Sequence, residues 1–194
     1  MPRRDRNRTL HLSIGRLLWD KGVGEYVEAA RILRTQYPTA RFQLLVPAGV
    51  DNPSAVTLDT VRAWEREGLI EYLGEAHDVR EHIASADCIV LPSYREGVPR
   101  TLMEASAMGR PIVATDVPGC REVVADGITG FLCEAKSAAS LADKLQAMMA
   151  LTPDERRAMG ERGRKKVAAE FDERSVIAQY LTTLREHTGV SLDF

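Results

Sequence analysis

The sequence predicts an α/β fold, a six-stranded parallel sheet with helices on both faces, followed by a helical C-terminal tail. Three observations predict it: short apolar runs alternate six times with longer amphipathic ones, residues 88–91 are apolar throughout, and the pattern beyond residue 137 is purely helical. Continuous apolar runs are typical of strands buried on both faces of a parallel sheet. Strand–helix alternation implies right-handed crossovers, which place helices on both sides of that sheet.

The first three strands and their helices are predicted from hydrophobic spacing. Apolar residues recur at three- and four-residue steps from Val23 to Tyr37, which predicts a helix with Asp20 as its N-cap. The other elements expected in this half are strands at 9–14, 42–46 and 70–73 and helices at 56–67 and 79–86.

The second half continues the same alternation. Pro99 is expected at the first position of a helix that Gly109 ends, and Pro118-Gly119 is expected to form a turn. Thr152 precedes Pro153-Asp154, a helix start in the tail. The other elements expected here are strands at 88–91, 112–114 and 130–132, helices at 99–108 and 121–125, and a last helix at 176–187.

The composition excludes several classes of protein. Its 194 residues are 44% hydrophobic and 28% charged, which excludes a disordered chain and a disulfide miniprotein. The 26 Lys and Arg against 28 Asp and Glu give a net charge of −2, so no nucleic-acid partner is expected. No run of 18 apolar residues could span a bilayer, and three scattered cysteines favour a reducing, cytoplasmic compartment.

The loop after the first strand, residues 15–22, carries two cations. Arg16 and Lys21 stand at the carboxyl edge of the sheet, where open α/β folds bind ligands, and next to a helix N-terminus. Two cations and free backbone N–H groups suit a diphosphate. The loop is neither a GxGxxG fingerprint nor a P-loop. The alternative is a pair of surface cations, with Lys21 facing Asp20 or Glu25.

A second candidate loop follows the fourth strand, at residues 93–104. Gly97 lets the backbone approach a ligand closely, and the N–H groups beyond it can hold a phosphate oxygen. Thr101 adds a hydroxyl in the first turn of the helix. This combination of buried strand, glycine and helix start indicates a binding loop.

Two glutamates flank that helix start. Glu104 lies five residues beyond Pro99, about 7–8 Å along the axis, a suitable reach from a diphosphate to the hydroxyls of a ribose. Glu96 precedes the helix in the loop that faces the cleft. Alternatively, Glu104 pairs with Arg100 at i, i−4 and Glu96 is a solvated loop acid.

The remaining nucleophilic and titratable groups favour structural roles. Cys120 has no histidine in its loop, so we expect an inert small residue rather than a nucleophile. His77 and Asp78 are expected to form a turn, with Asp78 as an N-cap. The four histidines and three cysteines show no metal-ligand spacing, so no metal site is expected.

Together, these motifs resemble the C-terminal, donor-binding domain of retaining glycosyltransferases of family 4, the group 1 transferases with two facing Rossmann-like domains. The resemblance covers almost the whole chain, from about residue 9 to 187. The matching segments, in chain order, are Gly15-Arg16-Leu17 with Lys21-Gly22, Glu96 and Glu104 as a Glu-x7-Glu signature, 114–119 with Glu122-Val123-Val124, Asp126-Gly127 with Gly130-Phe131-Leu132, and Gly163-Arg164 with Phe171.

The resemblance implies a role for each site residue. Arg16 and Lys21 would hold the donor diphosphate and stabilise the leaving nucleotide. Glu104 would accept from the ribose hydroxyls, and Glu96 would face the donor sugar. The residues that would complete the phosphate and sugar contacts are Gly15, Gly97, Val98, Pro99 and Thr101. The base would lie near residues 77–79.

The resemblance also implies the chemistry. Breaking a glycosyl–phosphate bond develops negative charge on the diphosphate, which two cations and a helix N-terminus stabilise most in the transition state. No cofactor and no divalent metal are then required. Same-face attack with retention is expected, and Glu96 orients the sugar rather than acting as a nucleophile. The Glu-Gly-Val-Pro-Arg-Thr sequence around Arg100 resembles transferases of bacterial surface polysaccharides, which suggests a UDP-sugar such as a UDP-N-acetylhexosamine.

The chain is therefore expected to be one half of a two-domain enzyme. Residues 1–8 would be a linker remnant, 9–170 the Rossmann-like nucleotide-sugar-binding domain, and 171–194 a helix that crosses back to a missing N-terminal domain. A glycan or lipid-linked acceptor would bind through that domain, at the inner face of the membrane. The isolated chain is expected to bind UDP or UDP-sugar weakly and to transfer nothing.

Two rival functions remain open at this point. One is a UDP-sugar epimerase or hydrolase of the same fold, and the other is a non-catalytic nucleotide-sugar-binding module. Release of UDP only in the presence of an acceptor would favour transfer. Binding without turnover, even with an N-terminal domain supplied, would favour the module.

Overall fold

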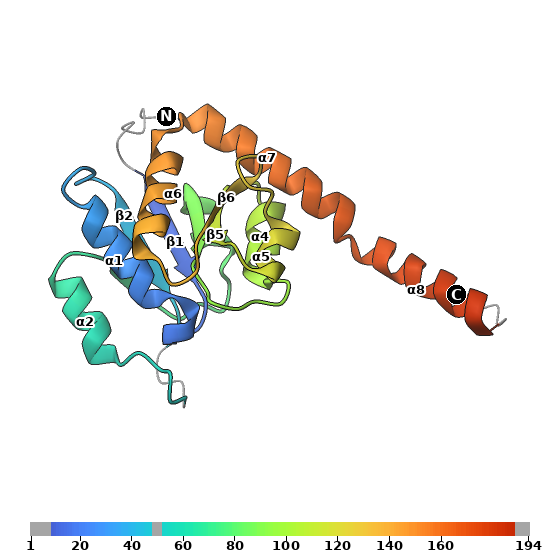
Figure 1. Ribbon diagram of the computed structural model, residues 1–194, viewed down its shortest axis with the longest axis horizontal. Coiled ribbons are helices and arrows are strands. Elements are labelled where there is room, and N and C mark those ends of the chain that lie inside the picture. The colour runs from blue at the N-terminus through green and yellow to red at the C-terminus, as the bar shows by residue number, and fades with distance from the viewer. Residues whose placement is uncertain (1–8, 48–51, 189–194) are drawn as a thin grey trace.

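The computed structural model describes residues 9–47 and 52–188, and it confirms the predicted α/β architecture (Figure 1). One parallel sheet has the strand order β3-β2-β1-β4-β5-β6. The connections therefore change direction between β1 and β4, the kind of switch point at which open sheets form a crevice. The strands are β1 (Leu10–Ile14), β2 (Arg41–Leu45), β3 (Glu71–Gly74), β4 (Cys88–Leu91), β5 (Ile112–Thr115) and β6 (Gly130–Cys133).

Helices cover both faces of this sheet, so β4 is an apolar run and every residue of β4 and β5 is buried. One face packs against α1, α2 and α6, and the other packs against α3, α4 and α5. The helices are η1 (Trp19–Lys21, a 3-10 turn), α1 (Val23–Leu33), α2 (Leu58–Arg66), α3 (Arg80–Ser85), α4 (Arg100–Ala107), α5 (Pro118–Val123), α6 (Ala138–Ala150), α7 (Pro153–Glu170) and α8 (Glu173–Thr188).

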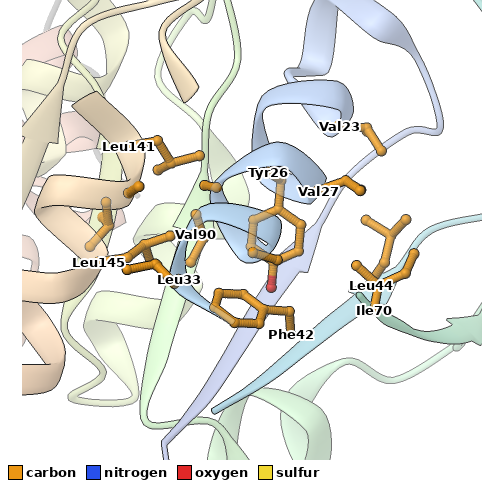
Figure 2. Packing of buried hydrophobic residues seen from close by; sticks show 14 of the residues in the cluster. Val23, Tyr26, Val27, Leu33, Phe42, Leu44, Ile70, Val90, Leu141 and Leu145 are labelled. Carbon is orange, nitrogen blue, oxygen red and sulfur yellow. The ribbon is translucent and has the colours of Figure 1, made fainter. Parts of the chain in front are cut away.

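The larger core lies between the sheet and helices α1 and α6 (Figure 2). Tyr26 and Leu33 project from the same face of α1, seven residues apart, as the helical spacing predicts. Tyr26 is fully buried, and its hydroxyl donates to the backbone carbonyls of His11 at 2.9 Å and Gln43 at 3.2 Å. This phenol therefore fixes α1 across two adjacent strands while its ring fills the core.

The start of α1 differs from the predicted one. Asp20 is not the N-cap, because residues Trp19–Lys21 form a separate 3-10 turn and Gly22 occupies the cap position with φ of +71°. Glycine adopts this left-handed conformation without a steric penalty. The helix also ends at Leu33, so Tyr37 packs on the core from outside it.

Three other boundaries are corrections. Pro99 is the N-cap of α4 rather than its first residue, and it has extended dihedral angles. The predicted turn at Pro118-Gly119 is instead the first turn of α5, because Pro118 has the φ angle that a helix start needs. Val79, not Asp78, caps α3; the Asp78 carboxylate accepts from the Arg80 N–H at 2.9 Å.

The C-terminal helices leave the sheet. Thr152 begins α7 with the predicted helix start, and a reciprocal capping box joins it to Glu155. Helix α7 packs on α4, and α8 then projects away from the body (Figure 1). Within the described residues no helix is long and apolar enough to cross a membrane. The linker predicted at residues 1–8 lies outside the described residues, as do 189–194 of the predicted last segment.

Candidate functional site

The candidate site lies at the carboxyl ends of β1 and β4, on both sides of the switch point. The chain leaves β1 toward α1 on one face of the sheet and leaves β4 toward α4 on the other. The two loops, residues 15–22 and 92–99, therefore meet above the centre of the sheet. They contain the sequence-predicted cations and one of the predicted glutamates.

An ion pair joins these loops across 75 residues of sequence. Lys21 Nζ lies 2.6 Å from Glu96 Oε1, and the two side chains are only 16% and 15% exposed. The sequence alternatives for Lys21, Asp20 and Glu25, are not its partners. A charge-assisted hydrogen bond of this length in a half-buried position holds both groups in one geometry.

Backbone contacts hold the same two loops together. A Cβ on Gly22 would lie 2.1 Å from the carbonyl oxygen of Pro92, so only glycine allows this close approach. The Tyr94 N–H donates to the carbonyl of Asp20 at 2.9 Å. The backbones of the two loops are therefore in contact beside the Lys21–Glu96 pair. A side chain at position 22 would force these backbones apart.

The segment that follows β5 packs on residues 92–99, the loop that carries Glu96 and that we call the glutamate loop. A Cβ on Gly119 would lie 1.6 Å from the Gly97 carbonyl oxygen and 2.6 Å from that of Glu96. The first turn of α5 therefore packs directly on the backbone that carries Glu96. Sequence reasoning placed Gly119 in a turn and did not identify this role.

Arg16 is presented differently from Lys21. Its side chain is exposed, and it forms no ion pair within residues 9–47 and 52–188. The next two residues, Leu17 and Leu18, anchor the loop in the core, and each is 1% exposed. The Val56 N–H also donates to the Leu17 carbonyl at 3.0 Å. A Cβ on Gly15 would meet no atom within 4 Å. The loop is therefore anchored while its cation remains accessible.

The N-terminus of α4 offers unpaired backbone donors. No side chain caps this helix, and its first hydrogen bonds are those from Leu102 and Met103 to the Pro99 carbonyl. Among the described residues, the N–H groups of Arg100 and Thr101 thus have no backbone acceptor, a suitable environment for an anion.

Gly97 has open space around its Cβ position. Val98, which we also expected at the site, is 46% exposed beside it.

Glu104 takes the alternative partner that the sequence left open. Its Oε1 accepts from Arg100 Nε at 2.9 Å, and this i, i+4 pair is solvent-exposed at the arginine. Glu104 lies in the second turn of α4, farther along the helix than the Lys21–Glu96 pair. No contact between Glu104 and that pair occurs among the described residues.

Sequence reasoning did not identify the contact between Tyr94 and Glu25. The Tyr94 hydroxyl donates to Glu25 Oε1 at 2.6 Å, which links the glutamate loop to the first turn of α1. Burial, and then the bond to Glu25, raises the pKa of Tyr94 to about 12, so the hydroxyl keeps its proton. The only available signal was an aromatic residue two positions before Glu96, and such a signal is weak.

The three cysteines, Cys88, Cys120 and Cys133, are free and buried. Cys120 is fully buried, and desolvation raises the pKa of its thiol to about 12, so no thiolate forms near neutral pH. His77 lies exposed in the β3–α3 loop, two strands away from β1. Throughout residues 9–47 and 52–188, no group of three or more His, Cys, Asp or Glu side chains is placed to hold a metal ion.

Comparison with known proteins identifies the family. The family described as glycosyl transferases group 1 matches residues 2–166. The chain is 34% identical over 170 residues to the N,N'-diacetylbacillosaminyl-diphospho-undecaprenol alpha-1,3-N-acetylgalactosaminyltransferase of Campylobacter jejuni, covering 88% of this chain and 43% of that protein. It is 37% identical over 134 residues to the N-acetyl-alpha-D-glucosaminyl L-malate synthase of Bacillus anthracis, covering 68% and 35%. The chain thus spans less than half the length of these relatives.

Solved structures share the fold. Anabaena HepE, solved in complex with UDP, superimposes with a TM-score of 0.81 at 22% identity, covering 93% of this chain and 49% of that one. At this identity the likeness establishes the Rossmann-like architecture and nothing finer. The family match, which extends over most of the sequence and over both loops of the site, is the stronger result. The chain belongs to the glycosyl transferases of group 1.

Proposed function

We propose that this chain is the donor-binding half of a retaining glycosyltransferase that uses a UDP-sugar. One observation carries the proposal: the Lys21–Glu96 ion pair lies at the switch point of the sheet, between helix starts that no side chain caps. The UDP in the HepE structure and the sugar-transferring names of the relatives support it.

In this proposal the diphosphate lies between the two loops. Lys21 has three N–H donors, so it can keep its bond to Glu96 and still donate to a phosphate oxygen. Arg16 is accessible from the same edge, and the N–H groups at the start of α4 supply further donors. These groups stabilise the charge that develops on the leaving UDP, the differential binding that lowers a barrier. Glu96 is then positioned to orient the sugar.

The ribose is assigned to Glu104. Its carboxylate is held by Arg100 in an exposed helical pair, which is the weak kind of ion pair. The hydroxyls of a ribose can therefore compete for this carboxylate, or share it, without breaking a buried contact. Thr101, one helical turn earlier on the same face, and the backbone at Pro99 complete the pocket.

The second half of the enzyme is also part of the proposal. We assign residues 9–170 to the donor domain and 171–194 to a segment that crosses to another domain. Ile177 and Tyr180, three residues apart on α8, are 50% and 70% exposed, and α8 points away from the body (Figure 1). A glycan or lipid-linked acceptor would bind on that second domain, at the cytoplasmic face of the membrane. The chain alone would then bind donor without transferring sugar.

Calorimetric titration of the 194-residue chain with UDP, UDP-sugars and GDP tests the site. We expect weak binding of UDP, and Lys21→Ala should weaken it by about tenfold or more because a charge-assisted contact is lost. Glu104→Ala should weaken it less. Lys165→Ala, which removes an exposed cation from α7, is the matched control. Absence of nucleotide binding at millimolar concentration would contradict the assignment.

A second experiment separates transfer from its rivals. The chain is joined to the upstream sequence of the protein and assayed for UDP release from UDP-sugar, with and without glycan or lipid-linked acceptors. Release that depends on an acceptor supports transfer. Release without acceptor, or epimerised sugar, supports the rival enzyme, and binding without any turnover supports a non-catalytic module.

A further inference from the structure

Tyr94 contacts the β1–α1 segment at two points. Its N–H donates to the Asp20 carbonyl at 2.9 Å, one residue before Lys21. Its hydroxyl donates to Glu25 Oε1 at 2.6 Å, in the first turn of α1. One residue of the 92–99 loop therefore binds the β1–α1 segment both before and after Lys21 in the sequence.

The surroundings of Glu25 show how much this bond matters. The other carboxylate oxygen, Glu25 Oε2, is buried and has no hydrogen-bond partner among the described residues. Loss of the Tyr94 hydroxyl would remove the donor to Oε1 as well. A buried carboxylate oxygen without a donor costs more free energy than an ordinary hydrogen bond contributes. Lys136 lies with Nζ 5.1 Å from the centre of the Tyr94 ring and covers one of its faces.

We propose that Tyr94 and Glu25 are positioning residues that hold Lys21 and Glu96 in register for the donor diphosphate, an inference that rests on the proposed function. Neither residue needs to touch the donor. Tyr94 lies two residues before Glu96, and Glu25 lies four residues after Lys21. Their bond thus links the segments that carry the ion pair through an independent contact.

A bound diphosphate would weaken the contact between Lys21 and Glu96. The phosphate oxygens compete with Glu96 for Lys21, so the ion pair that joins the loops is weakened at the moment of binding. The Tyr94–Glu25 bond is not exposed to this competition and keeps the loops together. Binding then needs no reordering of the loops, which is the usual benefit of a preorganised site.

Three single variants of the 194-residue chain and one double variant, titrated with UDP, test this role. Tyr94→Phe and Glu25→Ala should each weaken UDP binding by about fivefold, less than the full value of a hydrogen bond to a charged group, because the lost bond acts on binding only through the position of the loops. Combining them should give no further loss, because both remove the same bond. Glu25→Gln should restore most of the affinity, since an amide oxygen still accepts from the phenol. Unchanged affinity in Tyr94→Phe would overturn the inference.

Tyr26→Phe is the control for a purely structural effect. It also removes a buried phenol hydroxyl from α1 contacts, but at mid-strand positions in β1 and β2 rather than at their carboxyl ends. It should lower the free energy of unfolding without changing UDP affinity. If Tyr26→Phe weakens UDP binding as much as Tyr94→Phe does, the effect is general loosening and the positioning role is wrong.

Amide hydrogen exchange of the ligand-free chain separates this inference from the proposed function. Tyr94→Phe should raise exchange in residues 15–22 and 92–99 and leave α6 unchanged, because the bond joins the 92–99 loop to the first turn of α1, which directly follows the 15–22 loop. Unchanged exchange would overturn the positioning role whatever the nucleotide result. If the parent chain shows no UDP binding, the proposed function fails and the role assigned here fails with it.

Discussion

The helices of this chain begin in two different ways. Three of them start with a hydroxyl that accepts a backbone N–H of the first turn, and these are α2 with Thr57, α6 with Ser137 and α7 with Thr152. The two helices beside the cleft start with Gly22 and Pro99, and no side chain caps either one. A capped helix start stabilises the fold by itself, whereas an uncapped start leaves donors for a ligand. Helices α3 and α5 also lack a side-chain cap, so α1 and α4 stand out because their uncapped starts adjoin the loops that carry Lys21 and Glu96.

Replacing either of two glycines should have the largest effect on stability. Gly119 approaches the Gly97 carbonyl beside the cleft, and Gly160 of α7 approaches the Gly109 carbonyl, where an added Cβ would lie 1.9 Å away. Replacing either with alanine forces backbone apart and should lower the free energy of unfolding by about 2–4 kcal/mol, measured by chemical denaturation. Only Gly119→Ala should also displace Glu96 and weaken UDP binding. Equal UDP affinity in the two folded variants would break the comparison.

The pH dependence of stability should come from the core rather than the cleft. Burial, and then the charge of Arg156, lowers the pKa of His11 to about 3, so the folded chain keeps it neutral. The unfolded chain binds a proton below about pH 6.5, so stability falls as pH falls from 6.5 toward 3.

Between pH 7 and pH 5 this single histidine should cost about 1.5–2 kcal/mol of unfolding free energy. His11→Phe should flatten that dependence in denaturation curves, while His77→Gln on an exposed loop should not. A steep dependence that persists in His11→Phe would place its origin elsewhere in the molecule.

Adding a cap at the cleft should weaken ligand binding. In Pro99→Asp the new carboxylate can accept the N–H groups that begin α4 and occupy the place assigned to a phosphate. UDP affinity should fall by about tenfold, since an anion is then opposed by like charge at a helix N-terminus. Thr57→Asp, which replaces one cap by another on α2, is the matched control. Calorimetry that shows equal UDP affinity in both variants would remove α4 from the site.

Removing a cap from the body gives the smallest expected effect. Thr152→Ala removes the capping box of α7 and should lower the free energy of unfolding by about 1 kcal/mol, measured by urea denaturation. UDP affinity should stay unchanged. A change in affinity without a change in stability would contradict the assignment of capped starts to the fold.

The local pattern predicted most of the architecture, because the rules that decide it act over a few residues. The apolar run Cys88–Leu91 is a central strand with those boundaries, and Gly109 ends α4 with φ of +67°. The pattern could not predict contacts with distant parts of the chain. Gly119 was expected in a turn and lies in the first turn of α5, where its missing side chain accommodates the backbone at Gly97, 22 positions earlier.

Hydrophobic periodicity and the order of motifs were enough to predict the fold class, the family and the two loops that carry Lys21 and Glu96, because both are visible without knowledge of any contact. The partners of the charged side chains were established by the folded chain. It joined Lys21 to Glu96, Glu104 to Arg100 and Tyr94 to Glu25. The physical reason is that ion pairs and hydrogen bonds depend on distances of about 3 Å, and the sheet sets those distances between residues up to 75 positions apart.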